Sequence, residues 1–116
     1  MATKKVKSKT KAAYSREFYI KSAELFKVMS NPKRLEILNL IRDKEITVNE
    51  LSATLEVRKS NTSQHLAYLR YVGLVVSRRD GKNIYYKLVD PRIVEPCKIF
   101  EELMSKRKSI KSSLLD

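Results

Sequence analysis

Hydrogen-bonding side chains crowd the segment between Arg58 and Tyr68. Thr62, Leu66 and Leu69 recur there at the spacing of one helix face, so the polar residues between them fall on the outer and flanking faces. Amide, hydroxyl and imidazole groups are suited to reading base edges in a DNA major groove, and a lysine can reach a guanine. We therefore predict base contacts from Lys59, Asn61, Ser63, Gln64 and His65.

A basic hairpin follows this segment. Asp80 and Gly81 form a strong tight-turn signal between two short alternating stretches, 74–79 and 82–88. A polar helix face taken alone is more often simply solvated, but a basic hairpin tip beside it supplies what contacts to the flanking DNA backbone require. The predicted backbone contacts are Arg58, Ser60, Tyr68, Arg78, Arg79 and Lys82.

Three helices are predicted ahead of the polar segment. Apolar periodicity indicates a first helix over about 12–29 and a second that Asn31 caps, with Pro32 in its first position. A capping box from Thr47 to Glu50 opens a short third helix.

The fourth helix is the predicted recognition helix, at about 60–71. We expect Ser60 to cap it and Gly73 to end it. The wing spans about 75–88, and a last helix follows, in which Pro96 marks a kink or a late start. The order α-α-α-α-β-β-α predicts a mainly α fold with a small β-hairpin, which is a winged helix-turn-helix.

The chain divides into three predicted segments. Residues 1–11 hold five lysines and almost nothing apolar, which predicts a disordered basic arm. Residues 12–108 form one domain for DNA binding and dimerisation, and 109–116 form a polar tail. Two readings of the arm are equally supported: it contacts DNA, or it serves solubility alone.

The composition favours a polyanionic partner. The 116 residues include 25 Lys and Arg against 13 Asp and Glu, a formal net charge of +12. No apolar run approaches the roughly 20 residues that span a bilayer, so we expect a cytoplasmic protein without membrane contact, whose polyanion is double-stranded DNA.

Enzymatic chemistry is not predicted. The chain holds one cysteine, Cys97, and one histidine, His65, on different predicted helices, so they form no catalytic group. No glycine-rich phosphate loop occurs, and we predict no cofactor and no metal site.

Four segments together resemble the ArsR/SmtB family of winged-helix repressors. They are 31–38 (NPKRLEIL), 47–51 (TVNEL), 63–75 (SQHLAYLRYVGLV) and 78–88 (RRDGKNIYYKL). The resemblance implies a homodimer formed by the first and last helices, a twofold-symmetric operator, and release from DNA when an inducer is sensed. The dimer residues that it implies are Phe18, Phe26, Cys97, Phe100, Leu103 and Met104.

The metal-binding positions of that family carry other residues here. The two thiolates of a site in the third helix fall on Ser52 and Thr54, whose hydroxyls are poor ligands for a soft metal. The four ligands of a site in the last helix fall on Asp90, Arg92, Leu103 and Lys106, and two of these are cations. No metal sensor is therefore expected.

The sequence around the hairpin is most similar to that of the persulfide sensors of the BigR/SqrR branch. Their cysteine pair falls on Asn39 and Ser105, so the dithiol switch is absent. We interpret Cys97 as a small apolar residue of the dimer interface, with a redox role or a bridge between two Cys97 residues as alternatives. The inducer is unknown.

The predicted function is that of a sequence-specific repressor. Two alternatives use the same scaffold without operator specificity: a protein-interaction module, in which the charge serves solubility, and an RNA-binding module.

Overall fold

The computed structural model describes residues 13–106, and the chain divides after Ser30 into two compact units. The predicted basic arm at 1–11 and polar tail at 109–116 lie outside the described residues. The first unit holds helix α2 (Arg16–Met29), which Ser15 caps by accepting a hydrogen bond from the Phe18 N–H at 3.1 Å. None of the described helices has the length and apolar character needed to span a membrane.

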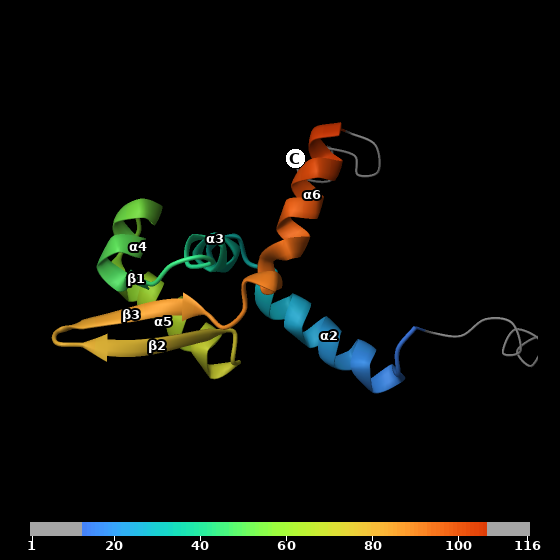
Figure 1. Ribbon diagram of the computed structural model, residues 1–116, viewed down its shortest axis with the longest axis horizontal. Coiled ribbons are helices and arrows are strands. Elements are labelled where there is room, and N and C mark those ends of the chain that lie inside the picture. Colours follow the sequence, from blue (N-terminus) through green and yellow to red (C-terminus); the bar gives the residue numbers. More distant parts are fainter. Residues whose placement is uncertain (1–12, 107–116) are drawn as a thin grey trace, which may run out of the picture. The chain divides into compact units, whose positions relative to one another are not determined.

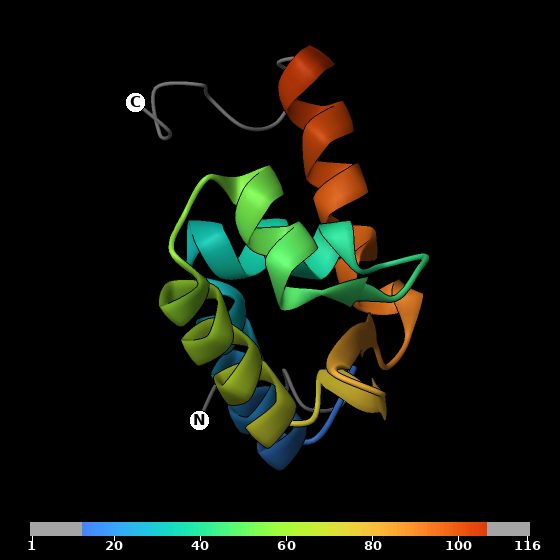
Figure 2. The same cartoon turned by 90° about the vertical axis from the view of Figure 1, so that its left-hand side faces the viewer.

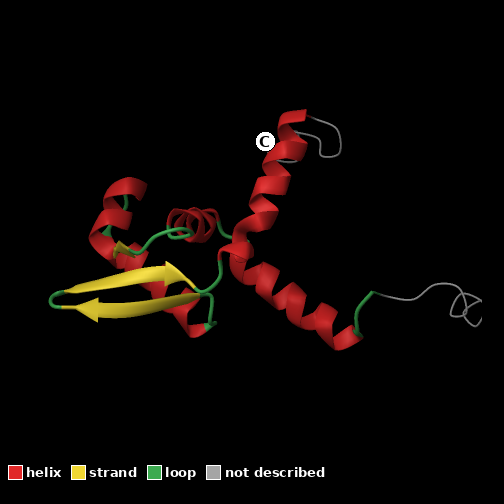
Figure 3. Cartoon of the chain, viewed as in Figure 1, coloured by secondary structure: helices red, strands yellow, loops and turns green. Residues whose placement is uncertain are grey.

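The second unit is a winged helix-turn-helix (Figures 1 and 3), as predicted. Its elements are α3 (Pro32–Leu40), β1 (Ile46–Thr47), α4 (Val48–Leu55), α5 (Lys59–Tyr71), β2 (Val75–Asp80), β3 (Asn83–Leu88), the 3-10 helix η1 (Pro91–Val94) and α6 (Glu95–Lys106). The three strands form an antiparallel sheet in the order β1-β3-β2.

Two predicted helix starts are confirmed by their caps. The Asn31 side chain accepts a hydrogen bond from the Arg34 N–H at 3.0 Å, and Pro32 fills the first position of α3, where a missing N–H costs nothing. At α4 the Thr47 hydroxyl accepts from the Glu50 N–H at 3.2 Å, and the Thr47 N–H donates to the Glu50 carboxylate at 3.0 Å.

The prediction that Ser60 caps the recognition helix is wrong. Helix α5 begins at Lys59, its N-cap is Arg58 without a side-chain hydrogen bond, and Ser60 lies inside the first turn. The reason is the turn before it. Glu56 takes a left-handed conformation with φ 56°, so the chain reaches Arg58 already extended, and the Arg58 carbonyl accepts the first bonds of α5.

The predicted end of α5 is confirmed. Gly73 has φ 90°, a left-handed conformation that favours glycine. The Gly73 N–H donates to the Arg70 carbonyl at 3.1 Å, and the Leu74 N–H donates to the Leu69 carbonyl at 2.9 Å. These two bonds make a Schellman motif, which turns the chain directly into β2.

The hairpin is confirmed, as is the late start that was one of two alternatives for the last helix, whereas strand β1 was not foreseen. Gly81 sits at the turn with φ 66°. Strand β1 pairs with β3, with Ile46 opposite Tyr86, so the wing is joined to the start of α4. The last predicted helix starts late, because residues after Asp90 first form η1 and only then α6, with Pro96 in its first turn.

The core of the second unit joins α3, α4, α5 and the wing. Its fully buried apolar side chains are Ile37, Leu38, Ile41, Leu51, Leu66, Leu69, Val75, Leu88 and Val94. The predicted inward stripe of the recognition helix is confirmed, because Thr62, Leu66 and Leu69 are each 0% exposed. Burial of this stripe directs the remaining faces of α5 outward.

A buried hydrogen bond joins α4 to α5. The Ser52 hydroxyl donates to the Thr62 Oγ1 at 2.9 Å, and both side chains are buried. Thr62 Oγ1 also lies 3.5 Å from the Arg58 carbonyl, so the bond sits directly behind the turn of the helix pair.

We expect Thr62→Val to destabilise the fold by about 1 to 3 kcal/mol, because the buried Ser52 hydroxyl loses its acceptor. The double variant Ser52→Ala/Thr62→Val is expected to cost less than the sum of the two single variants, since neither polar group is then left alone. Urea unfolding followed by circular dichroism measures both. Thr54→Val, on the exposed side of α4, is the control and should change stability by less than about 0.5 kcal/mol. Additive costs for the pair would contradict the coupling.

Candidate nucleic-acid interface

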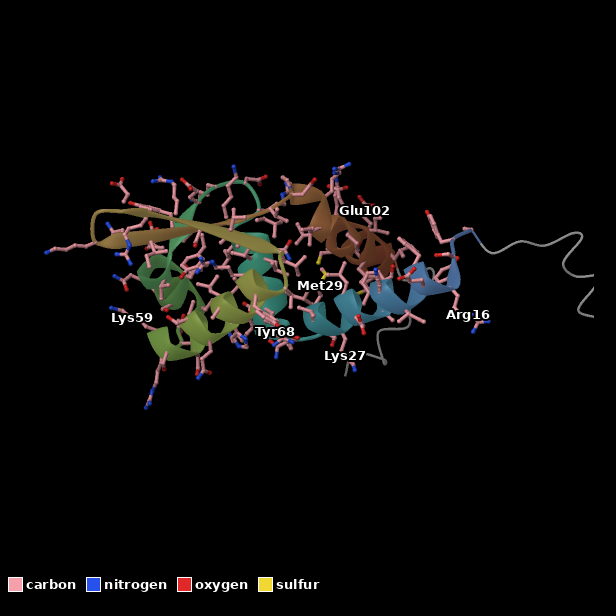
Figure 4. The ribbon with its side chains drawn as sticks, turned by 90° about the horizontal axis from the view of Figure 1, so that it is seen from below. Arg16, Lys27, Met29, Lys59, Tyr68 and Glu102 are labelled. Atoms are coloured by element: carbon pink, nitrogen blue, oxygen red, sulfur yellow. The ribbon has the colours of Figure 1, made fainter. Side chains whose placement is uncertain are left out.

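Helices α4 and α5 form the helix-turn-helix (Figure 2), and α5 presents the predicted contact residues on its surface. Lys59, Ser60, Asn61, Ser63, Gln64 and Tyr68 are exposed, and His65 is half-buried. Lys59 and Tyr68 lie toward opposite ends of the helix (Figure 4). The exposed polar side chains of α5 therefore extend from Lys59 to Tyr68.

The exposed surface of α5 has an outermost stripe and two flanks. At 100° per residue, Ser60, Gln64 and Tyr71 point most directly away from the buried stripe. Asn61, His65 and Tyr68 share one flank, since they are spaced four and three residues apart. This flank borders α3, as the contacts of Tyr68 show.

Arg34, in the first turn of α3, stacks on the recognition helix. Its guanidinium carbon lies 4.9 Å from the centroid of the Tyr68 ring, a cation–π contact. The pKa of His65 is lowered, first because the imidazole is partly buried and second because Arg34 places a positive charge near it. Arg34 was not among the predicted site residues. Its only signal in the sequence was its charge, and no local pattern relates it to Tyr68.

The wing carries three predicted cations, and one of them is engaged within the protein. Arg78 donates to both carboxylate oxygens of Glu45, at 3.0 and 2.7 Å, and lies over the Tyr85 ring at 4.7 Å. The hydrogen bond to Arg78 lowers the pKa of Glu45. Arg79 and Lys82 are exposed and make no ion pair with another described residue.

This pairing distinguishes the wing cations by their partners. An anion that bound Arg78 would compete with Glu45, whereas Arg79 and Lys82 meet no such competitor among residues 13–106. Because Glu45 lies in the loop before β1, the Arg78 pair also ties β2 to that loop.

The predicted dimer residues lie on two helices, each described by itself. On α2, Phe18 and Phe26 are exposed, Phe26 by 59%. On α6, Phe100 is 56% exposed and Met104 is also exposed, while Cys97 and Leu103 are half-buried. Both helices thus carry large apolar side chains that face solvent in the single chain.

The positions that correspond to family sensor residues have other contacts here. Ser52 is buried against Thr62, and Asp90 accepts hydrogen bonds from the Arg92 side chain and backbone, which lower the pKa of Asp90 to about 2. Within residues 13–106 no three His, Cys, Asp or Glu side chains gather to hold a metal ion. The Asn39 amide donates to the Cys97 sulfur at 3.6 Å.

Comparison with known proteins identifies the family. The family model described as bacterial regulatory protein, arsR family, matches residues 31–77, which run from the cap of α3 into β2. The HTH-type transcriptional regulator Rv0081 of Mycobacterium tuberculosis is 33% identical over 103 residues, covering 88% of this chain and 90% of that protein. This chain belongs to the ArsR family.

Other relatives agree with this assignment. The crystal structure of Rv0081 superposes with a TM-score of 0.68 over 82% of this chain and 96% of that one. The transcriptional activator HlyU of Vibrio cholerae is 46% identical over 68 residues, which cover 59% of this chain and 63% of HlyU, less than two thirds of its length. The biofilm growth-associated repressor of Agrobacterium fabrum is 37% identical over 70 residues, 60% of each chain.

The chain is therefore an ArsR/SmtB-type DNA-binding transcriptional regulator. The matched segment contains α3, α4 and α5, so Arg34 and Tyr68 both lie within it.

The lowered pKa of His65 is directly measurable, because it is the only histidine in the chain. We expect its NMR titration midpoint to lie below about 6.5, the ordinary value for histidine. Arg34→Gln should raise the midpoint by removing a nearby charge, whereas Lys87→Gln on β3 should not. Because the unfolded state then binds the proton more readily, His65 contributes a loss of stability as the pH falls below about 6.5. A midpoint at or above 6.5 would contradict the assigned surroundings.

Proposed function

We propose that this ArsR-family regulator is a homodimeric, sequence-specific repressor. Helix α5 enters the major groove of each half of a twofold-symmetric operator, and the wing contacts the flanking backbone. One observation carries the proposal: the buried Thr62, Leu66 and Leu69 stripe turns the polar face of α5 outward, next to a hairpin with exposed cations. The polar face supplies hydrogen-bonding groups for base edges, and the exposed cations supply charges for the phosphate backbone.

The proposed contacts keep the division predicted from the sequence. Bases are read by Lys59, Asn61, Ser63, Gln64 and His65, and the backbone is held by Arg58, Ser60, Tyr68, Arg78, Arg79 and Lys82. The pairing of Arg78 with Glu45 makes Arg79 and Lys82 the stronger backbone contacts of the wing.

The proposal of a homodimer is supported by the exposed apolar faces of α2 and α6. Phe26 and Phe100 are more than half exposed, which is costly for large aromatic side chains unless another surface covers them. A second copy offers the same faces, and isologous pairing would generate the twofold axis that a symmetric operator matches.

Repression and activation are distinguished by experiment. The Agrobacterium relative is named a repressor, which supports repression, while HlyU is named an activator. A reporter driven by a promoter that carries the selected site should fall in output when this chain is expressed. A rise would assign activation.

Selection from random duplex DNA tests the proposed binding. The full chain, at about 150 mM salt with competitor DNA, should enrich one motif with twofold symmetry. Failure to enrich any motif would overturn sequence-specific binding. An RNA hairpin pool in parallel tests the RNA-binding alternative, which tighter retention of RNA would favour.

Gln64→Ala should relax the preference at one base position of each half-site by about 1 to 3 kcal/mol, because an amide can bond a base edge through two hydrogen bonds. Its affinity for random DNA should change little. Arg79→Ala is the contrast: it should weaken selected and random duplexes alike, since a phosphate contact carries no sequence information. Fluorescence anisotropy measures the affinity of each variant for the selected and the random duplex. Equal losses from Gln64→Ala on the two duplexes would contradict its base-reading role.

Phe100→Glu should convert the dimer to a monomer of 13.5 kDa, because a carboxylate would enter an apolar interface. Sedimentation equilibrium measures the mass. Lys98→Glu places the same carboxylate at an exposed polar position of α6 and should leave the dimer intact. A wild-type monomer at micromolar concentration, or an unchanged mass for Phe100→Glu, would contradict the interface.

A further inference from the structure

We propose that the DNA-reading surface of α5 extends to its last turn, where the Tyr71 ring packs against the methyl group of a thymine in the major groove and Arg70 binds a nearby phosphate. The inference rests on the proposed function, because it adds a specificity-determining residue to the same helix face. Neither Arg70 nor Tyr71 is among the contacts predicted from the sequence.

Tyr71 lies on the same line of the helix surface as two of the proposed DNA contacts. Ser60, Gln64 and Tyr71 form the outermost stripe of α5, opposite the buried stripe. Tyr71 is 87% exposed, more than any other large apolar side chain in residues 13–106, and its ring stacks on no other ring or cation within them. An exposed tyrosine is ordinary on a protein surface, but this one continues the face that is proposed to enter the groove.

The spacing along the outermost stripe lets Tyr71 reach a second base pair. Ala67 lies between Gln64 and Tyr71 on the outer side of α5 and is exposed, so its small side chain lets the helix approach the bases closely. The rise from Gln64 to Tyr71 is about 10 Å at 1.5 Å per residue. With α5 lying along the groove, at 3.4 Å per base step, Tyr71 meets a base pair about three positions from the one that Gln64 reads.

The charge of α5 favours contact with a polyanion as far as the last turn. The helix holds no Asp or Glu from Lys59 to Tyr71, whereas each other α-helix of residues 13–106 holds at least one. Arg70 is exposed, shares a flank with Lys59 and pairs with no carboxylate of the described residues. A helix C-terminus carries a partial negative charge that repels phosphate, and Arg70 in the last turn offsets it.

The chemistry of the Tyr71 ring selects one base. Thymine carries a C5-methyl group, which is the apolar feature in the major-groove pattern of the four bases, and an aromatic ring binds it by removing both from water. The other three bases present hydrogen-bonding groups there, which a ring face would desolvate without replacing their hydrogen bonds. Tyr71 should therefore favour thymine at its position.

Selection from random duplex DNA with the Tyr71→Ala variant locates that position. The motif of the variant should lose a thymine preference about three base pairs from the position that Gln64→Ala relaxes, and it should otherwise match the wild-type motif. Identical motifs for Tyr71→Ala and the wild type would overturn the inference. Wild-type protein that enriches no motif would overturn the proposed function itself, which is a different result.

Replacement of the thymine by deoxyuridine tests the contact directly, because it removes the methyl group alone. The probes are two fluorescent 30-base-pair duplexes with the selected motif, one of which carries deoxyuridine at that position of one half-site. The wild type should bind the deoxyuridine duplex about fourfold more weakly, the factor expected for one buried methyl group. Tyr71→Ala should bind both duplexes equally. A thymine preference that Tyr71→Ala retains would assign the contact to another residue and overturn the inference.

Two further variants isolate the ring. Tyr71→Phe keeps the ring and should keep the fourfold difference, and loss of the difference would assign the contact to the hydroxyl and overturn the ring contact. Val76→Ala removes an exposed apolar side chain from β2 and should also keep the difference. Because Tyr71 is exposed, Tyr71→Ala should unfold at the wild-type temperature, as circular dichroism measures.

The salt dependence of binding tests the phosphate contact of Arg70. Between about 50 and 200 mM salt, the slope of log affinity against log salt reports released counterions. Arg70→Gln should reduce the slope by about 1 for each protomer bound, on selected and random duplexes alike. Lys27→Gln is the matched control, since Lys27 is the basic residue in the last turn of α2 and loses the same charge beside a helix C-terminus. Equal slopes for Arg70→Gln and Lys27→Gln would overturn the Arg70 contact.

Discussion

The packing of Thr62, Leu66 and Leu69 into the core sets the rotation of α5, and most other features of the second unit depend on it. If the helix turned by one residue, a hydroxyl or an amide would enter the core and a leucine would face solvent. The hydrogen bond between Ser52 and Thr62 adds direction to this apolar packing, because it is satisfied in only one arrangement of α4 against α5.

The cations on the surface of α5 and the wing differ in their partners within the protein. Glu45 holds Arg78 in the sheet, Tyr68 holds Arg34 on α5, and Arg79 and Lys82 lie exposed at the hairpin. A formal charge of +12 favours any polyanion at a distance, and we propose that these fixed positions select the cations that meet phosphates at close range. In this proposal the net charge accounts for the attraction to DNA, while the fixed positions of the cations account for the position of the protein along the duplex.

The sensor positions of the family have structural contacts in this chain. Ser52, at a thiolate position of other members, contributes to the helix pair, and Asp90 caps η1 beside Arg92. Asn39, at one position of the dithiol pair, contacts Cys97 on α6, so the one cysteine of the chain lies where α6 meets α3. We expect a signal for this regulator to act through chemistry other than those ligand sets.

The sequence by itself determined the helices with strong local signals, the hairpin at Gly81 and the polar face of α5, because caps, turn residues and periodicity act over a few positions. It did not determine the start of α5, which depends on the left-handed Glu56, nor strand β1, whose two residues pair only with distant β3. Tertiary structure alone decided that Arg78 is paired with Glu45 and that Arg34 lies over Tyr68, since each contact joins residues more than 30 positions apart. The periodicity of the sequence thus specified which residues face outward. Only the packing of the core specified which charged side chains lie next to them.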